Sequence, residues 1–363
     1  MAKRFMKGCE AVAETAVRAG CRFYAGYPIT PQNQIPEYLC WRLPEVGGTF
    51  VQAESEVSAI NIVYGSAASG TRSLISSASC GISLMSETIS WIAGAELPVV
   101  IMNFQRGGPG IGDIGPTQMD YAQATKAHGN GAFKMIVMAP ATLQETVDML
   151  YGAFDIAEQY RTPVYFLMDG ISAGLMESVE LPEMLDDSVV ASKKEALRSD
   201  WVLTGNDFHE GIRLVSAYAD SGAPLQKKNV HLAEKYREWE QTQIAYENYL
   251  TDDAEIVLTA YGISARFVRS AIEVLRADGI KAGMVRPINV YPFPNEAYDK
   301  LDYSKLKGML SVEMSIPELF VDDVRAAVAG RTKVETYATS GGVILDTNEI
   351  IRKAREICTK EAL

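Results

Sequence analysis

The chain has 363 residues, of which 47% are hydrophobic and 22% charged, a composition typical of globular proteins with a sizeable core. Its formal net charge of −12 disfavours nucleic acid and anionic membranes as partners, because both attract basic surfaces. The longest apolar stretch, residues 82–104, is interrupted by Glu87 and Glu96, so no membrane helix of roughly 20 residues is predicted.

Five cysteines are spread along the chain without any C-x-x-C spacing, and the three histidines are also scattered. An odd cysteine count without a preceding signal peptide predicts a reduced, cytoplasmic protein. Because zinc and iron–sulfur sites need clustered ligands, we expect this chain to hold neither.

Helix and strand patterns alternate over the first 175 residues. Helices are predicted at residues 8–19, 55–69 and 81–93, and another is predicted to begin near Pro31, because proline is favoured in a first helical turn. Strands are predicted at residues 22–25, 49–52, 72–76 and 98–104, and residues 117–127, 134–139, 142–160 and 163–168 continue the alternation. This order predicts an α/β domain over residues 1–175, with a parallel sheet covered by helices on both faces.

The second half begins with a connector, residues 176–253, in which Pro182 and acidic pairs interrupt any regular pattern. Within it, residues 231–250 predict a highly charged helix that is either solvated or packed across a subunit interface. A second α/β domain is predicted over residues 254–363. Its expected strands are residues 255–260, 281–285, 308–312 and 334–338, and its expected helices are residues 264–278, 317–329 and 347–358.

One polar turn follows the predicted strand at residues 22–25. It reads Gly-Tyr-Pro-Ile-Thr-Pro and comprises residues 26–31. In open α/β sheets, ligands bind where the carboxyl ends of the strands meet the following helices. Thr30 would place a hydroxyl there on a turn stiffened by two prolines, although threonine also serves routinely as a helix cap.

Two carboxylates, Glu54 and Glu56, stand where the strand at residues 49–52 passes into a helix. Most acidic residues at a helix start only complement the helix dipole, an effect of about 0.3–1 kcal/mol each. However, the helix after Glu56 is low in charge and rich in apolar residues, so this carboxylate is predicted to be partly buried. Burial favours the protonated form of a carboxylic acid near neutral pH.

A glycine-rich loop, residues 106–115, follows the buried strand at residues 98–104. Residues 110–115 match G-x-G-x-x-G, but a dinucleotide site needs this motif directly between strand and helix, with an acidic residue about 20 positions later. Here five residues precede Gly110, Pro116 follows, and no acid occurs between Asp120 and Glu145, so NAD binding is disfavoured. Arg106 could instead grip a carboxylate or phosphate, or form a surface ion pair on a flexible lid.

These three segments together resemble the 2-oxoacid:ferredoxin oxidoreductases, specifically the subunit with the thiamine pyrimidine-binding domain and a transketolase C-terminal-like domain. The resemblance runs over nearly the whole chain. The Arg-Gly-Gly-Pro-Gly sequence of residues 106–110 is most similar to the branched-chain, 2-oxoisovalerate type. This chain departs from the branched-chain pattern at Cys80, where a proline is usual, and at Gly115.

The resemblance implies a role for each of these motifs. Glu56 looks like the carboxylate that binds N1′ of the aminopyrimidine of thiamine diphosphate, with Glu54 as the nearby competitor. Thr30 and Arg106 look like the groups beside the substrate carbonyl and carboxylate. The adjoining turn residues Tyr27, Pro28 and Ile29 look like part of the cofactor site.

The implied reaction is CoA-dependent oxidative decarboxylation of a 2-oxoacid to an acyl-CoA and CO2, with electrons passed to ferredoxin. This chain has neither a Gly-Asp-Gly motif nor clustered cysteines. The residues that bind the diphosphate and its Mg2+, and the [4Fe-4S] clusters, are therefore expected on partner subunits. The implied partners are a diphosphate-binding beta subunit, a gamma subunit and a ferredoxin-like cluster subunit. The alternatives are a 2-oxoglutarate- or pyruvate-specific relative, a transketolase-like component and a non-catalytic scaffold subunit.

Overall fold

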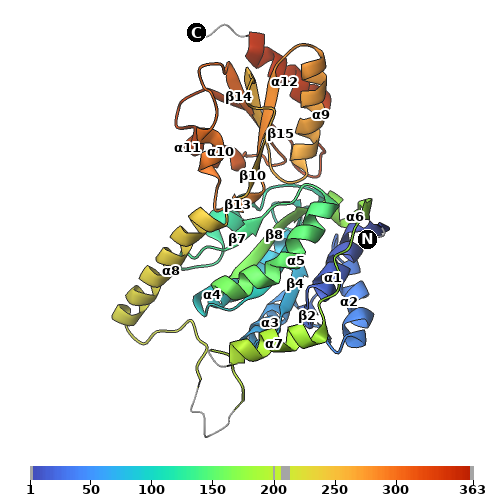
Figure 1. Cartoon of the computed structure of the whole chain (residues 1–363), viewed down its shortest axis with the longest axis vertical. Helices are drawn as coiled ribbons and strands as arrows, with labels where there is room; N and C mark the ends of the chain where they lie inside the picture. Colours follow the sequence, from blue (N-terminus) through green and yellow to red (C-terminus); the bar gives the residue numbers. More distant parts are fainter. Residues whose placement is uncertain (1–2, 199–200, 206–212, 360–363) are drawn as a thin grey trace.

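The computed structural model describes residues 3–198, 201–205 and 213–359, which form two stacked α/β units (Figure 1). Within the described ranges, the first unit is built on an eight-stranded sheet of order β13-β7-β8-β5-β4-β2-β3, with β6 paired to β5. The members of this sheet are β2 (Phe23–Gly26), β3 (Thr49–Gln52), β4 (Ser73–Ser77), β5 (Val99–Gly107), β6 (Asp113–Pro116), β7 (Ile136–Met138), β8 (Pro163–Asp169) and β13 (Asn289–Tyr291). All neighbouring pairs from β7 to β3 are parallel, whereas β6 and β13 pair antiparallel.

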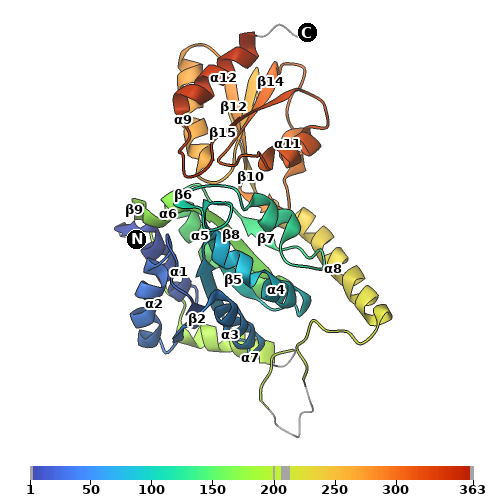
Figure 2. The same cartoon turned by 180° about the vertical axis from the view of Figure 1, so that it is seen from behind.

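Helices cover both faces of this sheet, as the alternation predicts. The helices on one face are α1 (Gly8–Arg18), α2 (Gln34–Glu45) and α5 (Leu143–Tyr160), and they enclose a core that includes Tyr24, Met102 and Phe166 (Figure 1). On the other face, α3 (Glu56–Ala68) and α4 (Ser79–Gly94) pack over Ile75 and Ile101 (Figure 2). Successive residues of each strand therefore contribute alternately to the two cores, because their side chains point to opposite faces of the sheet.

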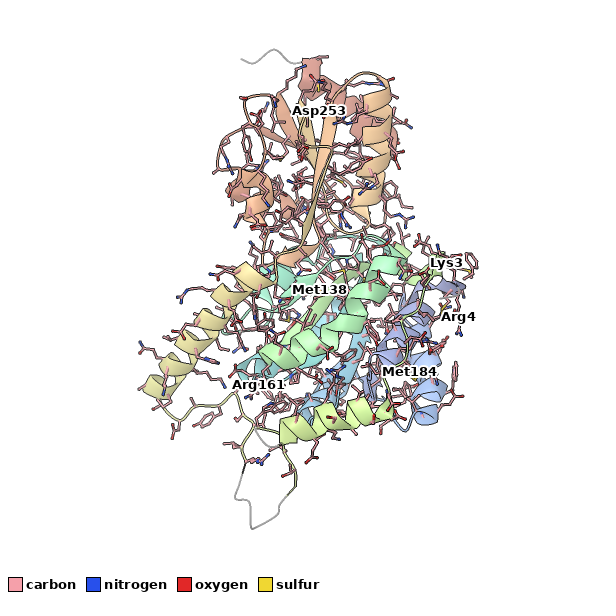
Figure 3. All side chains as sticks on the ribbon, viewed as in Figure 1. Lys3, Arg4, Met138, Arg161, Met184 and Asp253 are labelled. Carbon is pink, nitrogen blue, oxygen red and sulfur yellow. The ribbon has the colours of Figure 1, made fainter. Side chains whose placement is uncertain are left out.

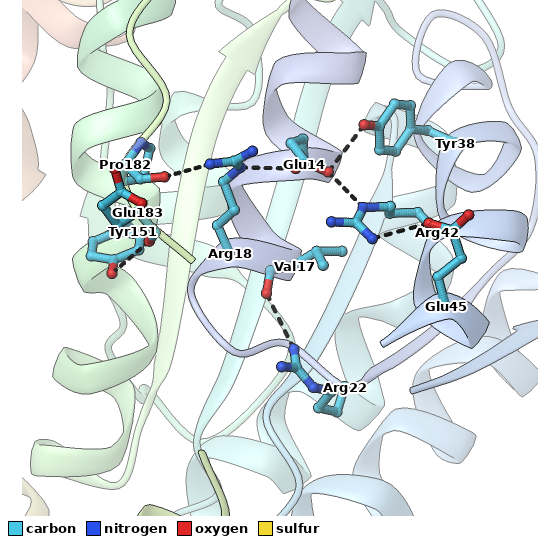
Figure 4. Close-up of polar contacts among 10 residues, drawn as sticks. All are labelled: Glu14, Val17, Arg18, Arg22, Tyr38, Arg42, Glu45, Tyr151, Pro182 and Glu183. Atoms are coloured by element: carbon cyan, nitrogen blue, oxygen red, sulfur yellow. Dashed lines mark hydrogen bonds and ion pairs between the residues drawn. The ribbon is translucent and has the colours of Figure 1, made fainter. Parts of the chain in front are cut away.

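A buried carboxylate joins α1 and α2 on the first of these faces. Glu14 accepts hydrogen bonds from Arg18 Nε at 2.8 Å, from Arg42 Nε at 2.9 Å and from the Tyr38 hydroxyl at 3.0 Å (Figure 4). Burial alone would raise the pKa of Glu14, but the bonds from Arg42 and Arg18 hold this pKa below its usual value. The charge is thus satisfied internally and supports the helix pair beside the turn at residues 26–31.

The helix predicted near Pro31 begins three residues later, at Gln34. Residues 27–33 form a turn closed by the bond from Gln32 N to Ile29 O at 3.1 Å, and Pro36 is the proline in the first helical turn. Residues 117–127 also differ from a regular element, since they hold only a short π-helix, η1 (Gln123–Ala127).

The predicted connector contains more structure than its composition indicates. β9 (Met176–Val179) pairs with β1 (Arg4–Lys7), and α6 (Gly170–Gly174) and α7 (Asp187–Arg198) lie on either side of it in the sequence. The charged helix predicted at residues 231–250 is wrong in both bounds: α8 spans Gly222–Thr242, and β10 (Tyr246–Tyr249) follows. The reason is tertiary, because β10 pairs antiparallel with β12 of the second unit. In α8 most side chains are exposed, while Trp239 is buried against Tyr160 and Tyr236.

The second unit holds a sheet of order β10-β12-β11-β14-β15. Its remaining strands are β11 (Ile256–Thr259), β12 (Ala282–Pro287), β14 (Gly308–Glu313) and β15 (Val334–Ala338), and its helices are α9 (Ser264–Ala277), α10 (Asn295–Asp299), α11 (Phe320–Val328) and α12 (Thr347–Thr359). The predicted helix at residues 317–329 starts only at Phe320, because the Glu313 carboxylate accepts the amides of residues 319–321 and fixes the helix start there.

The two units are joined through their sheets and through buried polar contacts. β13 leaves the second unit and pairs with β7 of the first, with Asn289 opposite Met138, a residue that Figure 3 shows at the boundary. Arg286 donates to both oxygens of Glu145, at 2.9 and 2.8 Å. Gln118 makes further hydrogen bonds across the junction, to Met314, Ser264 and Tyr261. No helix in the described residues is long and apolar enough to cross a membrane.

Candidate functional site

The predicted site residues lie at one edge of the first sheet. β5, β4, β2 and β3 are neighbours and run parallel, so their carboxyl ends meet at this edge. Thr30 follows β2, Glu56 follows β3, and Arg106 is the penultimate residue of β5. The strand therefore extends beyond the predicted end at residue 104 and carries Arg106 within it. This edge is where α/β sheets bind ligands.

Glu56 is the first residue of α3, which Ser55 caps by accepting a hydrogen bond from Ser58 N at 3.2 Å. Its side chain is 6% exposed and lies against the first turn of α4. A Cβ atom on Gly81 would stand 2.6 Å from Glu56 Oε1 and 2.2 Å from Ser77 Oγ, so only glycine leaves room for both groups.

These two groups lack partners within the described part of the chain. The Ser77 hydroxyl is buried without a hydrogen bond, and no donor or cation is paired with the Glu56 carboxylate. A largely buried carboxylate beside an unpaired hydroxyl offers hydrogen-bonding groups that a ligand can satisfy. The arrangement thus fits a ring nitrogen that receives a hydrogen bond from Glu56, as the aminopyrimidine of thiamine diphosphate does.

Glu54 has a different environment from Glu56. It is fully exposed, and its carboxylate accepts a hydrogen bond from the Ser58 hydroxyl, which lowers the pKa of Glu54. This is the behaviour of an acidic group at a helix start. The structure therefore separates the two carboxylates by burial, which the sequence alone could only suggest.

Arg106 is 7% exposed, and its guanidinium bonds only to carbonyl groups in the described residues. Nη1 donates to Thr30 O at 3.1 Å, Nη2 donates to Ile111 O at 3.0 Å, and Nε is buried without an acceptor. This burial does not fit the alternative of a surface ion pair. A buried cation with a donor to spare fits an anionic ligand such as a carboxylate.

The turn before α2 presents Thr30 to solvent. The Thr30 hydroxyl accepts a bond from Asn33 Nδ2 at 3.4 Å and does not cap α2, because Asn33 precedes that helix. Tyr27 is 38% exposed, Pro28 is exposed and Ile29 is half-buried, so this turn is open to solvent. The bond from Arg106 to the Thr30 carbonyl connects this turn to β5.

Sequence reasoning missed two residues that connect these groups, Ser79 and Asp120. Ser79 Oγ accepts the Arg106 amide at 3.0 Å and donates to Asp120 Oδ2 at 2.5 Å, which also accepts from Asn103 Nδ2 at 2.8 Å. Burial raises the pKa of Asp120, and these two bonds oppose the effect. Because Ser79 and Gly81 share the first turn of α4, this turn touches both Arg106 and Glu56. The run of small residues at positions 76–81 was the only signal for it.

The glycine-rich loop does not have the geometry of a dinucleotide fingerprint. After Gly110 and Gly112, both with positive φ, the chain enters β6 and not a helix. No helix start therefore follows to receive a pyrophosphate, which is the physical basis of that motif. Among the described residues there is also no group of three or more His, Cys, Asp or Glu side chains placed to hold a metal ion.

Comparison with known proteins yields matches along the chain. Residues 14–247 match the family described as "Pyruvate flavodoxin/ferredoxin oxidoreductase, thiamine diP-bdg", and residues 254–350 match "Pyruvate:ferredoxin oxidoreductase core domain II". The ketoisovalerate oxidoreductase subunit VorB of Methanothermobacter thermautotrophicus is 42% identical over 98% of both chains. The 2-oxoglutarate synthase subunit KorA of the same organism is 32% identical over 96% of both chains.

A solved structure has the same fold. It is a 2-oxoglutarate:ferredoxin oxidoreductase from Magnetococcus marinus, solved with 2-oxoglutarate, coenzyme A and succinyl-CoA bound. It aligns with a TM-score of 0.85 at 23% identity, covering 98% of this chain and 65% of that one. Taken with the family match over residues 14–247, these findings show that the chain belongs to the thiamine diphosphate-dependent 2-oxoacid:ferredoxin oxidoreductases, as one subunit of such an enzyme.

Proposed function

We propose that this chain supplies the pyrimidine-binding half of the active site of a 2-oxoacid:ferredoxin oxidoreductase, with 2-oxoisovalerate and related branched 2-oxoacids as its substrates. The observation that carries this proposal is Glu56, a buried carboxylate without a partner in the described residues, held against Gly81 at the edge where Arg106 and Thr30 also lie. The reaction would be oxidative decarboxylation with CoA as the acyl acceptor.

In this proposal each residue at this edge of the sheet has a separate role. Glu56 holds a proton at N1′ of the aminopyrimidine and so favours the imino form of that ring. Thiamine diphosphate, when bound, supplies the carbanion and the electron sink for decarboxylation. Arg106 pairs with the substrate carboxylate through its free Nε–H, and the Thr30 hydroxyl orients the adjacent carbonyl. Orientation and charge placement are the contributions a protein makes to such a cofactor. Tyr27, Pro28 and Ile29 form the wall of the cofactor site.

Partner subunits complete the site. The sequence has no Gly-Asp-Gly motif and no C-x-x-C spacing, so the groups that hold the diphosphate, Mg2+ and the [4Fe-4S] clusters belong to other chains. Those chains would be a diphosphate-binding subunit, a gamma subunit and a ferredoxin-like cluster subunit. The isolated chain should therefore be colourless and bind thiamine diphosphate poorly, and iron in the purified chain would overturn this division.

The branched-chain assignment is supported by the 42% identity to the ketoisovalerate oxidoreductase subunit, compared with 32% to the 2-oxoglutarate synthase subunit. The loop after Arg106 adds a physical argument, because residues 107–116 contain no Lys or further Arg. The second carboxylate of 2-oxoglutarate would need its own cation, since an unpaired buried charge is costly. A branched apolar tail needs only space and apolar walls.

The test is a comparison of kcat/KM for 2-oxoisovalerate, pyruvate and 2-oxoglutarate on the complex assembled with its partner subunits, with benzyl viologen as electron acceptor. We expect 2-oxoisovalerate to be preferred. A hydrophobic pocket discriminates by about 10–200-fold per methylene, so the margin over pyruvate should be measurable. A preference for 2-oxoglutarate would overturn the substrate assignment. Activity with none of the three would overturn the proposed reaction.

A further inference from the structure

The segment of residues 106–118, which contains the glycine-rich loop and β6, is anchored to the second unit at its far end, through Gln118. The backbone of this residue donates to Met314 O at 2.8 Å, and its side-chain oxygen accepts from Met314 N at 2.9 Å and Ser264 Oγ at 2.7 Å. Its side-chain nitrogen donates to Tyr261 O at 3.0 Å. Because Gln118 is 1% exposed and all these bonds are satisfied, the end of the loop is fixed to the second unit.

A second contact is made within this segment, by Gly115 of β6 against a turn of the second unit at residues 339–342. A Cβ atom on Gly115 would stand 2.6 Å from Gly342 Cα, a backbone atom that cannot move aside cheaply. A Cβ atom on Gly342 would stand 2.5 Å from Asp113 Oδ1 and 3.2 Å from Gly115 Cα. The two backbones thus approach so closely that neither position has room for a side chain.

The shape of the loop bears directly on Arg106. Arg106 Nη2 donates to the carbonyl of Ile111 at the loop tip, and Arg106 pairs with Pro116 across β5 and β6. Asp113 Oδ1 accepts the Gly115 amide at 2.6 Å, which holds the return strand of the loop. A displacement at Gly115 would therefore reach the guanidinium through Ile111 and through the strand pair.

We propose that the turn at residues 339–342 of the second unit is a positioning element for Arg106, acting through its contact with Gly115. The second unit would then set the geometry of substrate binding without touching the substrate. This inference rests on the proposed role of Arg106 as the group that binds the substrate carboxylate. It predicts that a single methyl group at the contact alters substrate affinity more than the chemical step.

The test uses Gly342→Ala in the assembled complex, with Gly330→Ala as its matched control. Both glycines lie in the second unit with positive φ, 82° and 75°, so both substitutions carry the same kind of backbone strain. A Cβ atom on Gly330, however, would meet nothing within 4 Å. The control therefore removes backbone strain from the comparison and leaves only the collision with the loop.

Two readouts are needed, KM and kcat for 2-oxoisovalerate, and hydrogen exchange of the amides at residues 107–116. We expect Gly342→Ala to raise KM by roughly 10- to 100-fold, because small misplacements of substrate-binding groups have effects of that order. We expect kcat to change by less than about threefold, the pattern of lost uniform binding. Exchange in the loop should be faster, while Gly330→Ala leaves the loop exchange and both kinetic constants unchanged.

If hydrogen exchange in the loop is equal in Gly342→Ala and Gly330→Ala, the contact does not hold the loop in place. If exchange is faster in Gly342→Ala but KM is unchanged, the contact holds the loop but does not position Arg106. If Gly342→Ala does not assemble, Gly115→Ala makes the same collision from the first unit and is judged by the same readouts. A wild-type complex inactive with every 2-oxoacid would remove the proposed function. The exchange difference would then still decide whether the turn holds the loop.

Discussion

Replacement of Glu56 by glutamine is the most direct test of the half-site. Glutamine has the same shape as glutamate, so it fits the space left by Gly81, but it cannot exchange a proton with a ring nitrogen. Loss of a proton-handling group typically lowers a rate by about 10²–10⁴-fold. This corresponds to about 2.7–5.4 kcal/mol in the activation free energy, at ~1.36 kcal/mol per factor of ten.

The same substitution should not destabilise the protein. The Glu56 side chain is 6% exposed and has no donor or cation as its partner in the described residues, so no stabilising bond is lost. Because glutamine fills the same volume, we expect Tm to stay within the roughly 2–4 °C that 1 kcal/mol represents in a domain of this size. Loss of activity without loss of stability is the combined result that we expect.

The assay is reduction of benzyl viologen by the assembled complex with 2-oxoisovalerate and CoA, together with thermal unfolding of the same samples. Glu54→Gln is the matched control, because Glu54 is two residues away but fully exposed. We expect this control to retain at least half of the activity. Loss of a proton-handling group should lower the rate at least about 100-fold. If Glu56→Gln keeps more than about a tenth of the wild-type rate, the role of Glu56 is therefore refuted. A large loss of activity in Glu54→Gln would assign the proton-handling role to Glu54.

Other predictions concern the neighbouring groups and the second unit. Arg106→Lys should raise KM for the 2-oxoacid more than it lowers Tm, because a point charge replaces a planar fork, and an unchanged KM would exclude a substrate contact. Gly81→Ala should abolish activity while leaving the fold intact by circular dichroism, since its Cβ atom would collide with Glu56 Oε1 at 2.6 Å. Burial raises the pKa of Glu313 from 4.5 to about 7, against three backbone amides that favour the ionised form. The folded state therefore binds more protons than the unfolded state between pH 4.5 and 7, and this contribution to stability is lost as pH rises through that window. Urea unfolding at pH 5 and pH 7.5 should show a smaller decrease for Glu313→Gln than for the wild type, and parallel curves would contradict this assignment.

The sequence by itself determined the architecture of the first unit. The run at residues 99–102 is wholly apolar, and helix and strand patterns alternate on both sides of it, so local patterns agree with the fold. The same patterns placed Thr30, Glu56 and Arg106 at strand ends, because the carboxyl ends of parallel strands share one edge.

Only the tertiary structure decided which of these groups is buried and what each one touches. Residues 246–249 lie in a charged segment that reads as helix, yet they form a strand because β12 offers an edge to pair with. Glu54 and Glu56 stand two residues apart at the same helix start, and their difference in burial arises because the first turn of α4 packs over Glu56 and not over Glu54. The contact of Gly115 with Gly342 joins residues more than 200 positions apart, and such close approaches depend on how two finished domains fit together, which no local pattern encodes.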